Sequence, residues 1–437
     1  MPVKEAYPKV LIISPCAFNH ITGTGITFSN LFYGWPKENL AVATGDTVEV
    51  TKDICSNYYF LTDAELPKMF PFNIVKNLIS AKKKQDINYI PKNVQPVSSK
   101  NDSLIRTLSR KIFGSAGVPE TAHLTQKLAK WIDEFKPNVI YTITGSIGYP
   151  ELVLKVHEKF KIPIVLHIMD DGVIAPVLTG AFSVYTMRKF EGTIKLIMST
   201  ASRRVAICRE MAEAYEKRYG YSFDYFQSTV SDELLLLPPN DKSVTQEICL
   251  IYSGSIFSYA QLESLKDCCR SVIELSKDGY NISLNIYTAL DIYKDISDEL
   301  PKSEGAVRLH DALFGNECMN VLRDATILLL PVNFDRKSVN YIKLSMPTKV
   351  PFYLASGTPV LVYGPSEVAQ VKYATCEGWG YVVNQRGVER IKKGLIELIN
   401  NSELRQILSK KAREIAMKNH SDSVVRTKFQ QLLKNCN

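Results

Sequence analysis

Short apolar runs that alternate with longer amphipathic stretches are the feature of this sequence that most restricts its fold. In the first half, β-branched runs at 10–14, 139–142, 162–168 and 204–208 are followed by helical patterns at 26–35, 151–160, 184–198 and 209–219. Strands that are apolar throughout are typical of parallel sheets covered by helices on both faces. The pattern therefore predicts a doubly wound α/β domain.

The same alternation resumes in the second half, after a turn-rich stretch at 231–245 that suits a linker. Strands are expected at 248–252, 282–287, 326–330 and 359–362, helices at 259–275, 317–323 and 348–355, and a helical tail from 388 to 434. A length of 437 residues is ample for two such domains. We predict two Rossmann-like parallel-sheet domains facing a cleft, at 1–235 and 236–415, followed by a helix at 416–437.

Composition excludes several classes of protein. The net charge of +8 is too small for a dedicated nucleic-acid binder, so no nucleic-acid partner is expected. No apolar run approaches the ~20 residues that span a bilayer, and charges near the N-terminus argue against a signal peptide. The nine cysteines are scattered and never spaced as Cys-x-x-Cys, which indicates reduced thiols in a cytoplasmic protein and no metal site.

Ligands of doubly wound sheets bind at the carboxyl ends of the strands, so the loops there are the candidate sites. The loop after the first strand contains Gly23, Thr24 and Gly25, whose backbone can approach an anion closely at the start of a helix. It is not the Gly-x-Gly-x-x-Gly of nicotinamide-binding proteins, because Phe28 stands three residues after Gly25. The structural alternative is simply a tight turn.

The end of the strand at 162–168 and the loop after it carry the candidate catalytic residues His167, Asp170 and Asp171. Adjacent carboxylates at the mouth of a buried strand suit acid–base chemistry. The structural alternative is that one aspartate caps the next segment and His167 is a core residue. The pair is also a possible divalent-metal ligand, but no third carboxylate stands nearby, and we predict no metal.

Two segments of the second half are candidate anion sites. Gly254 and Ser255 end one strand with a small-residue turn, and Pro347, Thr348 and Lys349 precede a short helix that Gly357 is expected to end. Thr348 is expected to be the N-cap. A lysine in the first turn opposes the helix dipole unless a phosphate lies over that turn, with an exposed lysine as the alternative.

Together, the Gly-Thr-Gly loop, residues 162–171 and the Pro347-Thr-Lys…Ala-Ser-Gly-Thr-Pro-Val block resemble the GT-B nucleotide-sugar glycosyltransferases, family 4 in particular. The resemblance implies a donor bound mainly by the C-terminal domain, metal-independent chemistry without a cofactor, and a last helix that braces the N-terminal domain. It implies that residues 310–313, with Asp311, Ala312 and Leu313, flank the nucleoside base. Two glutamates common in the family are replaced here by Leu344 and Phe352. Sugar-hydroxyl contacts must then come from elsewhere, with Asp335, Asn340 and Tyr341 as candidates.

The sequence therefore predicts a glycosyltransferase of hexosyltransferase type. Lys349, Thr348 and the Gly23–Gly25 amides would stabilise the leaving diphosphate, and Asp170 or Asp171 would orient or deprotonate the acceptor hydroxyl. The alternatives are a catalytically silent binding or scaffold subunit, which the missing glutamates allow, and a GT-B sugar-nucleotide epimerase.

Residues 68–136 form a basic insertion in the N-terminal domain. It holds thirteen Lys and Arg against five Asp and Glu, an excess equal to the whole chain's +8. Leu104, Leu108 and Ile112 recur at helical spacing beside basic residues, as in helices that lie on anionic membranes. We expect an enzyme of bacterial-type glycan or polysaccharide assembly, cytoplasmic or peripheral on the inner membrane face, with a glycan or lipid-linked acceptor. A solvated helix packed on its own domain is the alternative.

Overall fold

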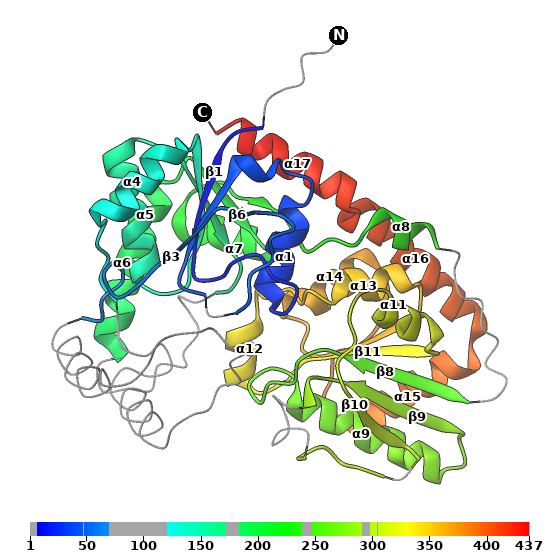
Figure 1. The fold of residues 1–437 in the computed structure, drawn as a ribbon. Coiled ribbons are helices and arrows are strands. Elements are labelled where there is room, and N and C mark those ends of the chain that lie inside the picture. The colour runs from blue at the N-terminus through cyan, green and yellow to red at the C-terminus, as the bar shows by residue number, and fades with distance from the viewer. Residues whose placement is uncertain are drawn as a thin grey trace, which may run out of the picture. The chain divides into compact units, whose positions relative to one another are not determined.

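The computed structural model describes residues 7–46, 48–69, 120–171, 183–237, 247–290, 298–303 and 305–436, which fall into two compact units (Figure 1). The first unit comprises Met1–Ala206, Ala214–Asp224 and Gln430–Asn437. The second comprises Ile207–Glu213 and Tyr225–Phe429. The end of the chain thus groups with the first unit, and most of the basic insertion, including its leucine stripe, lies outside the described residues.

A seven-stranded sheet in the order β3-β2-β1-β4-β5-β6-β7 forms the centre of the first unit. The neighbouring strands from β3 to β6 pair in parallel. The strands are β1 (Val10–Ser14), β2 (Leu40–Thr44), β3 (Tyr58–Phe60), β4 (Val139–Ile143), β5 (Ile164–Ile168), β6 (Arg203–Ala206) and β7 (Asp224–Tyr225). The helices are α1 (Gly23–Phe32), α4 (Gln126–Phe135), α5 (Gly148–Phe160), α6 (Ser183–Thr200) and α7 (Arg209–Tyr219), with a 3₁₀ turn at Lys37–Asn39.

Burial on both faces explains why these strands read as continuous apolar runs. Every residue of β1, β4 and β5 is buried, because helices cover the sheet and leave no solvated side. The predicted strand at 10–14 is confirmed residue for residue. The first helix begins three residues earlier than predicted, at Gly23.

The second unit holds a six-stranded parallel sheet in the order β10-β9-β8-β11-β12-β13. Its strands are β8 (Ile248–Ser253), β9 (Ile282–Tyr287), β10 (Val307–His310), β11 (Ile327–Pro331), β12 (Val360–Tyr363) and β13 (Gly380–Val383). The helices are α8 (Asp232–Leu236), α9 (Leu262–Lys277), α11 (Gly315–Asp324), α12 (Arg336–Ile342), α13 (Val350–Ser356), α14 (Ala369–Glu377), α15 (Val388–Asn400) and α16 (Ser402–His420). Residues of helix α17 (Asp422–Lys434) are divided between the two units after Phe429. The predicted pair of parallel α/β sheets and the helical tail are confirmed.

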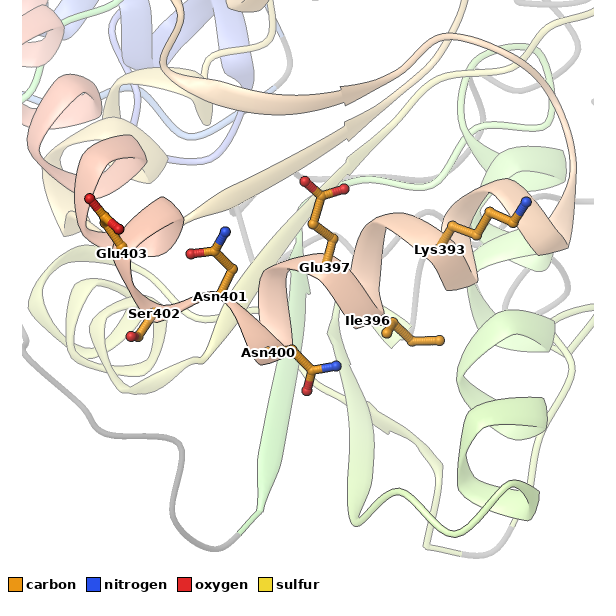
Figure 2. A pocket seen from close by; sticks show the side chains of 7 residues that line it. All are labelled: Lys393, Ile396, Glu397, Asn400, Asn401, Ser402 and Glu403. Atoms are coloured by element: carbon orange, nitrogen blue, oxygen red, sulfur yellow. The ribbon is translucent and has the colours of Figure 1, made fainter.

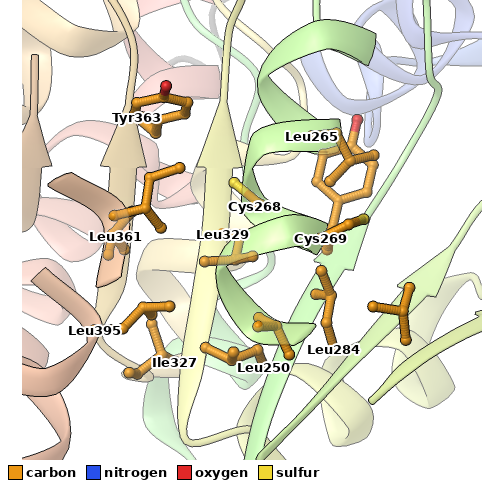
Figure 3. Close-up of a cluster of buried hydrophobic side chains, with 14 of the residues drawn as sticks. Leu250, Leu265, Cys268, Cys269, Leu284, Ile327, Leu329, Leu361, Tyr363 and Leu395 are labelled. Atoms are coloured by element: carbon orange, nitrogen blue, oxygen red, sulfur yellow. The ribbon is translucent and has the colours of Figure 1, made fainter. Parts of the chain in front are cut away.

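The core of the second unit lies between one face of this sheet and helices α9 and α15 (Figure 3). Leu265 of α9 and Leu395 of α15 are fully buried there against strand residues such as Leu329. Within the predicted linker, Ser231 caps the short helix α8 by accepting a hydrogen bond from the Leu234 N–H. All nine cysteines are free thiols. Among the helices described, none is long and apolar enough to cross a membrane.

Candidate active site

Each sheet reverses its strand order once, and ligands of open α/β sheets bind outside the carboxyl ends of the strands at that point. In the second unit the reversal falls between β8 and β11. Gly254 follows β8 with φ of +134°, a conformation that favours glycine. A Cβ at Gly254 would lie only 2.8 Å from Lys349 Nζ. The structure therefore places two residues of the predicted donor site, Gly254 and Lys349, side by side at the switch point.

The Lys349 residue as a whole is partly exposed, but its Nζ atom is buried and has no hydrogen-bond partner among the residues that the structure describes. Nζ lies 3.9 Å from the centroid of the Tyr252 ring, a cation–π distance. Burial lowers the pKa of Lys349 to about 7, an effect that the nearby Cys318 thiol partly opposes. An unpaired amine of this kind is suited to binding an anion.

Helix α13 begins at Val350, two residues after the start of the predicted range 348–355. Lys349, rather than Thr348, is its N-cap, and the Val350 N–H donates to the Pro347 carbonyl. Pro347 and Thr348 are partly exposed in the turn before the helix. Gly357 ends the helix in the left-handed conformation with φ of +72°, as predicted. This turn fixes the backbone from which the Lys349 side chain reaches Gly254.

The neighbouring strand ends continue the same edge of the sheet. The Gly254 N–H donates to the Tyr287 carbonyl, and the rings of Tyr287 and His310 stack with centroids 4.7 Å apart. His310 Nε2 lies 2.8 Å from Asn285 Oδ1, which orients the imidazole. Of the predicted base-flanking residues that follow β10, Asp311 is exposed, and Ala312 and Leu313 are partly exposed. The exposed Ser255 lies on the β8 side of this edge.

In the first unit, Gly23, Thr24 and Gly25 form the first turn of α1 rather than a preceding loop. Thr22 caps the helix by accepting a hydrogen bond from the Gly25 N–H. A Cβ at Gly25 would lie 2.2 Å from Asn19 Nδ2, so close packing against a buried side chain requires this glycine. The Gly25 amide is therefore committed to the cap.

The three candidate catalytic residues at the end of β5 and in the loop after it differ in their surroundings. His167 is wholly buried and is hydrogen-bonded through Nδ1 to the Tyr141 hydroxyl, and burial lowers its pKa to about 3. Both Asp171 oxygens accept hydrogen bonds from Arg218, at 2.9 and 3.0 Å. Of the three, only Asp170 has an exposed side chain. This arrangement favours the structural alternative for His167 and Asp171, and it leaves Asp170 as the catalytic candidate.

Sequence reasoning missed three side chains that shape the site in the second unit. Tyr252 supplies the ring under Lys349, Cys318 of α11 lies 3.8 Å from the Ser253 hydroxyl, and Tyr287 stacks on His310. Tyr252 and Tyr287 stand at the ends of their strands, where an aromatic residue also suits a buried core. Only their position at the carboxyl edge distinguishes them.

One open depression of about 570 Å³ lies at the turn between α15 and α16, lined by Lys393, Glu397, Asn401 and their neighbours (Figure 2). The depression lies at the C-terminal end of α15. Since the carboxyl end of β13 leads into the N-terminal end of α15, the depression lies away from the carboxyl edge of the sheet. Glu397 already accepts a hydrogen bond from Tyr381, and Asn401 caps α16. These polar groups serve the fold. Within the described ranges, no group of three or more His, Cys, Asp or Glu side chains is placed to hold a metal ion.

Solved structures of glycosyltransferases match this chain over nearly its whole length. The trehalose-6-phosphate synthase OtsA is 9% identical with a TM-score of 0.63, covering 98% of this chain and 99% of that one. HepE of Anabaena, in complex with UDP, is 13% identical with a TM-score of 0.59 over 97% and 99% of the two chains. WaaG, a glycosyltransferase involved in lipopolysaccharide biosynthesis, is 12% identical with a TM-score of 0.56 over 97% and 100%.

The fold is thus the GT-B fold of glycosyltransferases, as the sequence resemblance implied. No family model matches the sequence, and no curated protein matches it.

Proposed function

We propose that this protein transfers a sugar from a nucleoside-diphosphate sugar to a hydroxyl acceptor. The observation that carries the proposal is the buried, unpartnered Nζ of Lys349 beside Gly254 at the switch point of the second sheet. A buried amine without a counter-charge is costly for stability, whereas a bound diphosphate supplies that charge. HepE, solved with UDP, and a trehalose-6-phosphate protein of E. coli, solved with UDP-2-fluoro glucose, share the fold.

The second unit is the donor side in this proposal. Negative charge develops on the diphosphate as the glycosidic bond breaks, and a preorganised positive group stabilises it without help from a metal ion. Lys349 would fill that role beside the Gly254–Ser255 turn. The Tyr287–His310 stack and residues 311–313 offer a surface for the nucleoside. The reaction needs no cofactor beyond the donor substrate.

Asp170 of the first unit is the proposed general base or transition-state stabiliser, because it is an exposed residue at the mouth of β5. The acceptor is proposed to be a glycan or lipid-linked hydroxyl, in glycan or polysaccharide assembly at the inner face of a membrane. The basic composition of residues 68–136 supports this proposal. WaaG, which shares the fold, is a glycosyltransferase involved in lipopolysaccharide biosynthesis.

A thermal-shift panel of UDP, GDP, dTDP and ADP tests the proposal. A ligand at ~100 times its dissociation constant stabilises by ~2.7 kcal/mol, which is readily measured. The expected result is a shift with one nucleotide that falls strongly in Lys349→Met, since a charge-assisted contact of about 1.5–3 kcal/mol corresponds to roughly 10- to 150-fold in affinity.

Lys343→Met is the matched control, because Lys343 is an exposed lysine of the same segment and should leave the shift unchanged. A shift with none of the four nucleotides would contradict the proposed function. Equal shifts in wild type and Lys349→Met would show that Lys349 does not hold the diphosphate. Release of sugar from the donor by wild type but not by Asp170→Asn would separate an enzyme from a silent binding subunit.

A further inference from the structure

Among the described residues, no acidic side chain pairs with Lys349. Its Nζ is buried without a hydrogen-bond partner, and none of the ion pairs among the described residues includes it. The ring face of Tyr252 lies on one side of Nζ, and Gly254 presents only backbone on another. Transfer of an ammonium from water to such a place is unfavourable unless an anion accompanies it.

The titratable groups that face Lys349 come from three elements. Tyr252 of β8 and Tyr353 of α13 are buried phenols, and burial raises the pKa of Tyr353. Cys318 of α11 is a thiol whose pKa burial also raises, with opposing effects from Ser253 and Lys349. The Tyr353 hydroxyl accepts a hydrogen bond from the Ser253 N–H at 2.9 Å, which commits it to the strand end. Because phenols and buried thiols are neutral near pH 7, none of the three groups supplies the missing negative charge.

We propose that, above neutral pH, Lys349 is largely an uncharged amine in the empty site and takes up one proton from solvent when a diphosphate binds. This inference rests on the proposed function, because the bound diphosphate is the counter-charge that makes the ammonium favourable. The amine nitrogen accepts the proton, and no other bond is made or broken. Release of the nucleoside diphosphate returns the proton to solvent.

A consequence is that donor affinity depends on pH through the protein rather than through the ligand. Since burial lowers the pKa of the free Lys349 to about 7, protonation becomes progressively harder as pH rises above that value. Affinity should then fall by about tenfold for each pH unit above 7 while the bound lysine stays charged. Nucleoside-diphosphate sugars are suitable probes, because their phosphodiester groups do not titrate between pH 6 and 9.

Isothermal titration calorimetry with UDP-glucose, GDP-glucose, dTDP-glucose and ADP-glucose tests the inference, in two buffers that differ in ionisation enthalpy. The donor that binds should take up about one proton at pH 8.5 and almost none at pH 6. Lys349→Arg is the matched control, since arginine stays charged at every such pH and should bind without proton uptake. Binding at pH 8.5 without proton uptake in the wild type would overturn the inference alone. Binding by none of the four donors would overturn the proposed function, and this inference with it.

A second measurement needs no nucleotide. Reductive methylation with ¹³C-formaldehyde labels lysine amines for NMR, and the Lys349 signal is the one missing from Lys349→Arg. That signal should titrate near pH 7 in the wild type, well below the pH near 10 at which an ordinary lysine titrates. Titration near pH 10 would overturn the inference even if a donor binds.

Discussion

Asp170 and Asp171 are adjacent in sequence, yet the structure predicts opposite consequences when each is replaced by asparagine. The Asp171 side chain is 5% exposed, and its oxygens accept hydrogen bonds from Arg218 at 2.9 and 3.0 Å and from the Tyr215 hydroxyl at 2.9 Å. Asp170 is exposed at the mouth of the same strand. Asp171→Asn should therefore lower the free energy of unfolding of the first unit, whereas Asp170→Asn should lower turnover.

The magnitude follows from the ion pair. Removing one partner of a buried pair costs about 3–5 kcal/mol, because the other charge stays buried without compensation. The Arg218 side chain is 24% exposed, so water relieves part of that cost, and about 2–4 kcal/mol is expected for Asp171→Asn. For a unit of this size that corresponds to a melting temperature lower by roughly 4–16 °C. Asp170→Asn should stay within about 0.5 kcal/mol of the wild type.

Tryptophan fluorescence can report the first unit alone. Trp35 and Trp131 belong to that unit and Trp379 to the other, so urea unfolding in a Trp379→Phe background follows only the first. Replacing both partners, as Asp171→Asn with Arg218→Met, should recover much of the loss because no charge is left unpaired.

An Asp171→Asn chain as stable as Asp170→Asn would refute the reasoning. So would a double variant no more stable than Asp171→Asn. In assays of the active enzyme, Asp170→Asn should lower turnover by roughly 100- to 10,000-fold while donor affinity survives.

Three further predictions concern other parts of the chain. Burial lowers the pKa of His167 to about 3 and that of His420 to about 4. Below pH 6.5 the unfolded chain therefore binds more protons than the folded chain. The free energy of unfolding should then fall by up to about 1.4 kcal/mol per pH unit for each histidine as the pH drops from 6.5 toward 4. His167→Gln should reduce that slope in acid-dependent urea unfolding, and an unchanged slope would contradict the assignment. Gly254→Ala should weaken nucleotide binding at least tenfold in calorimetry, because alanine is strained at a φ of +134° and its Cβ would lie 2.8 Å from Lys349 Nζ. Unaltered affinity would show that the close approach of Gly254 to Lys349 is unimportant for binding. The wild type should float with phosphatidylglycerol vesicles at low salt, and a variant with residues 82–84 changed to glutamate should not, since each basic residue near an anionic surface contributes about 1 kcal/mol. If the variant floats as well as the wild type, the basic insertion does not dock on the membrane.

The fold was predictable because strands that are buried on both faces are apolar throughout, and the sequence shows this directly. A strand such as Val10–Ser14, buried on both faces, must be apolar at every position, and this makes it visible without any knowledge of its neighbours. Helix starts were less predictable. The helices that begin at Gly23 and Val350 start three residues before and two residues after the expected positions, because the choice of cap depends on which hydrogen bonds the surrounding chain can complete.

The candidate site was predictable only in part. Lys349 and Gly254 could each be singled out from local sequence, since a lysine at a helix start opposes the helix dipole and a small-residue turn between a strand and a helix suits an anion. Their proximity could not, because 94 intervening residues and the β8–β11 crossover bring them together. The different surroundings of Asp170 and Asp171 were equally hidden, since Arg218 reaches Asp171 from helix α7.

The sequence by itself determined the two parallel α/β sheets, since patterns of burial repeat along the chain and need no partner to be recognised. Only the tertiary structure decided which polar side chains are available for chemistry. The Asp171 carboxylate is engaged by a guanidinium far along the chain, the His167 ring is buried against Tyr141, and the Lys349 amine has no partner. The charge and reactivity of each group depend on the residues that surround it in space, and those neighbours are set by the folded chain rather than by local sequence.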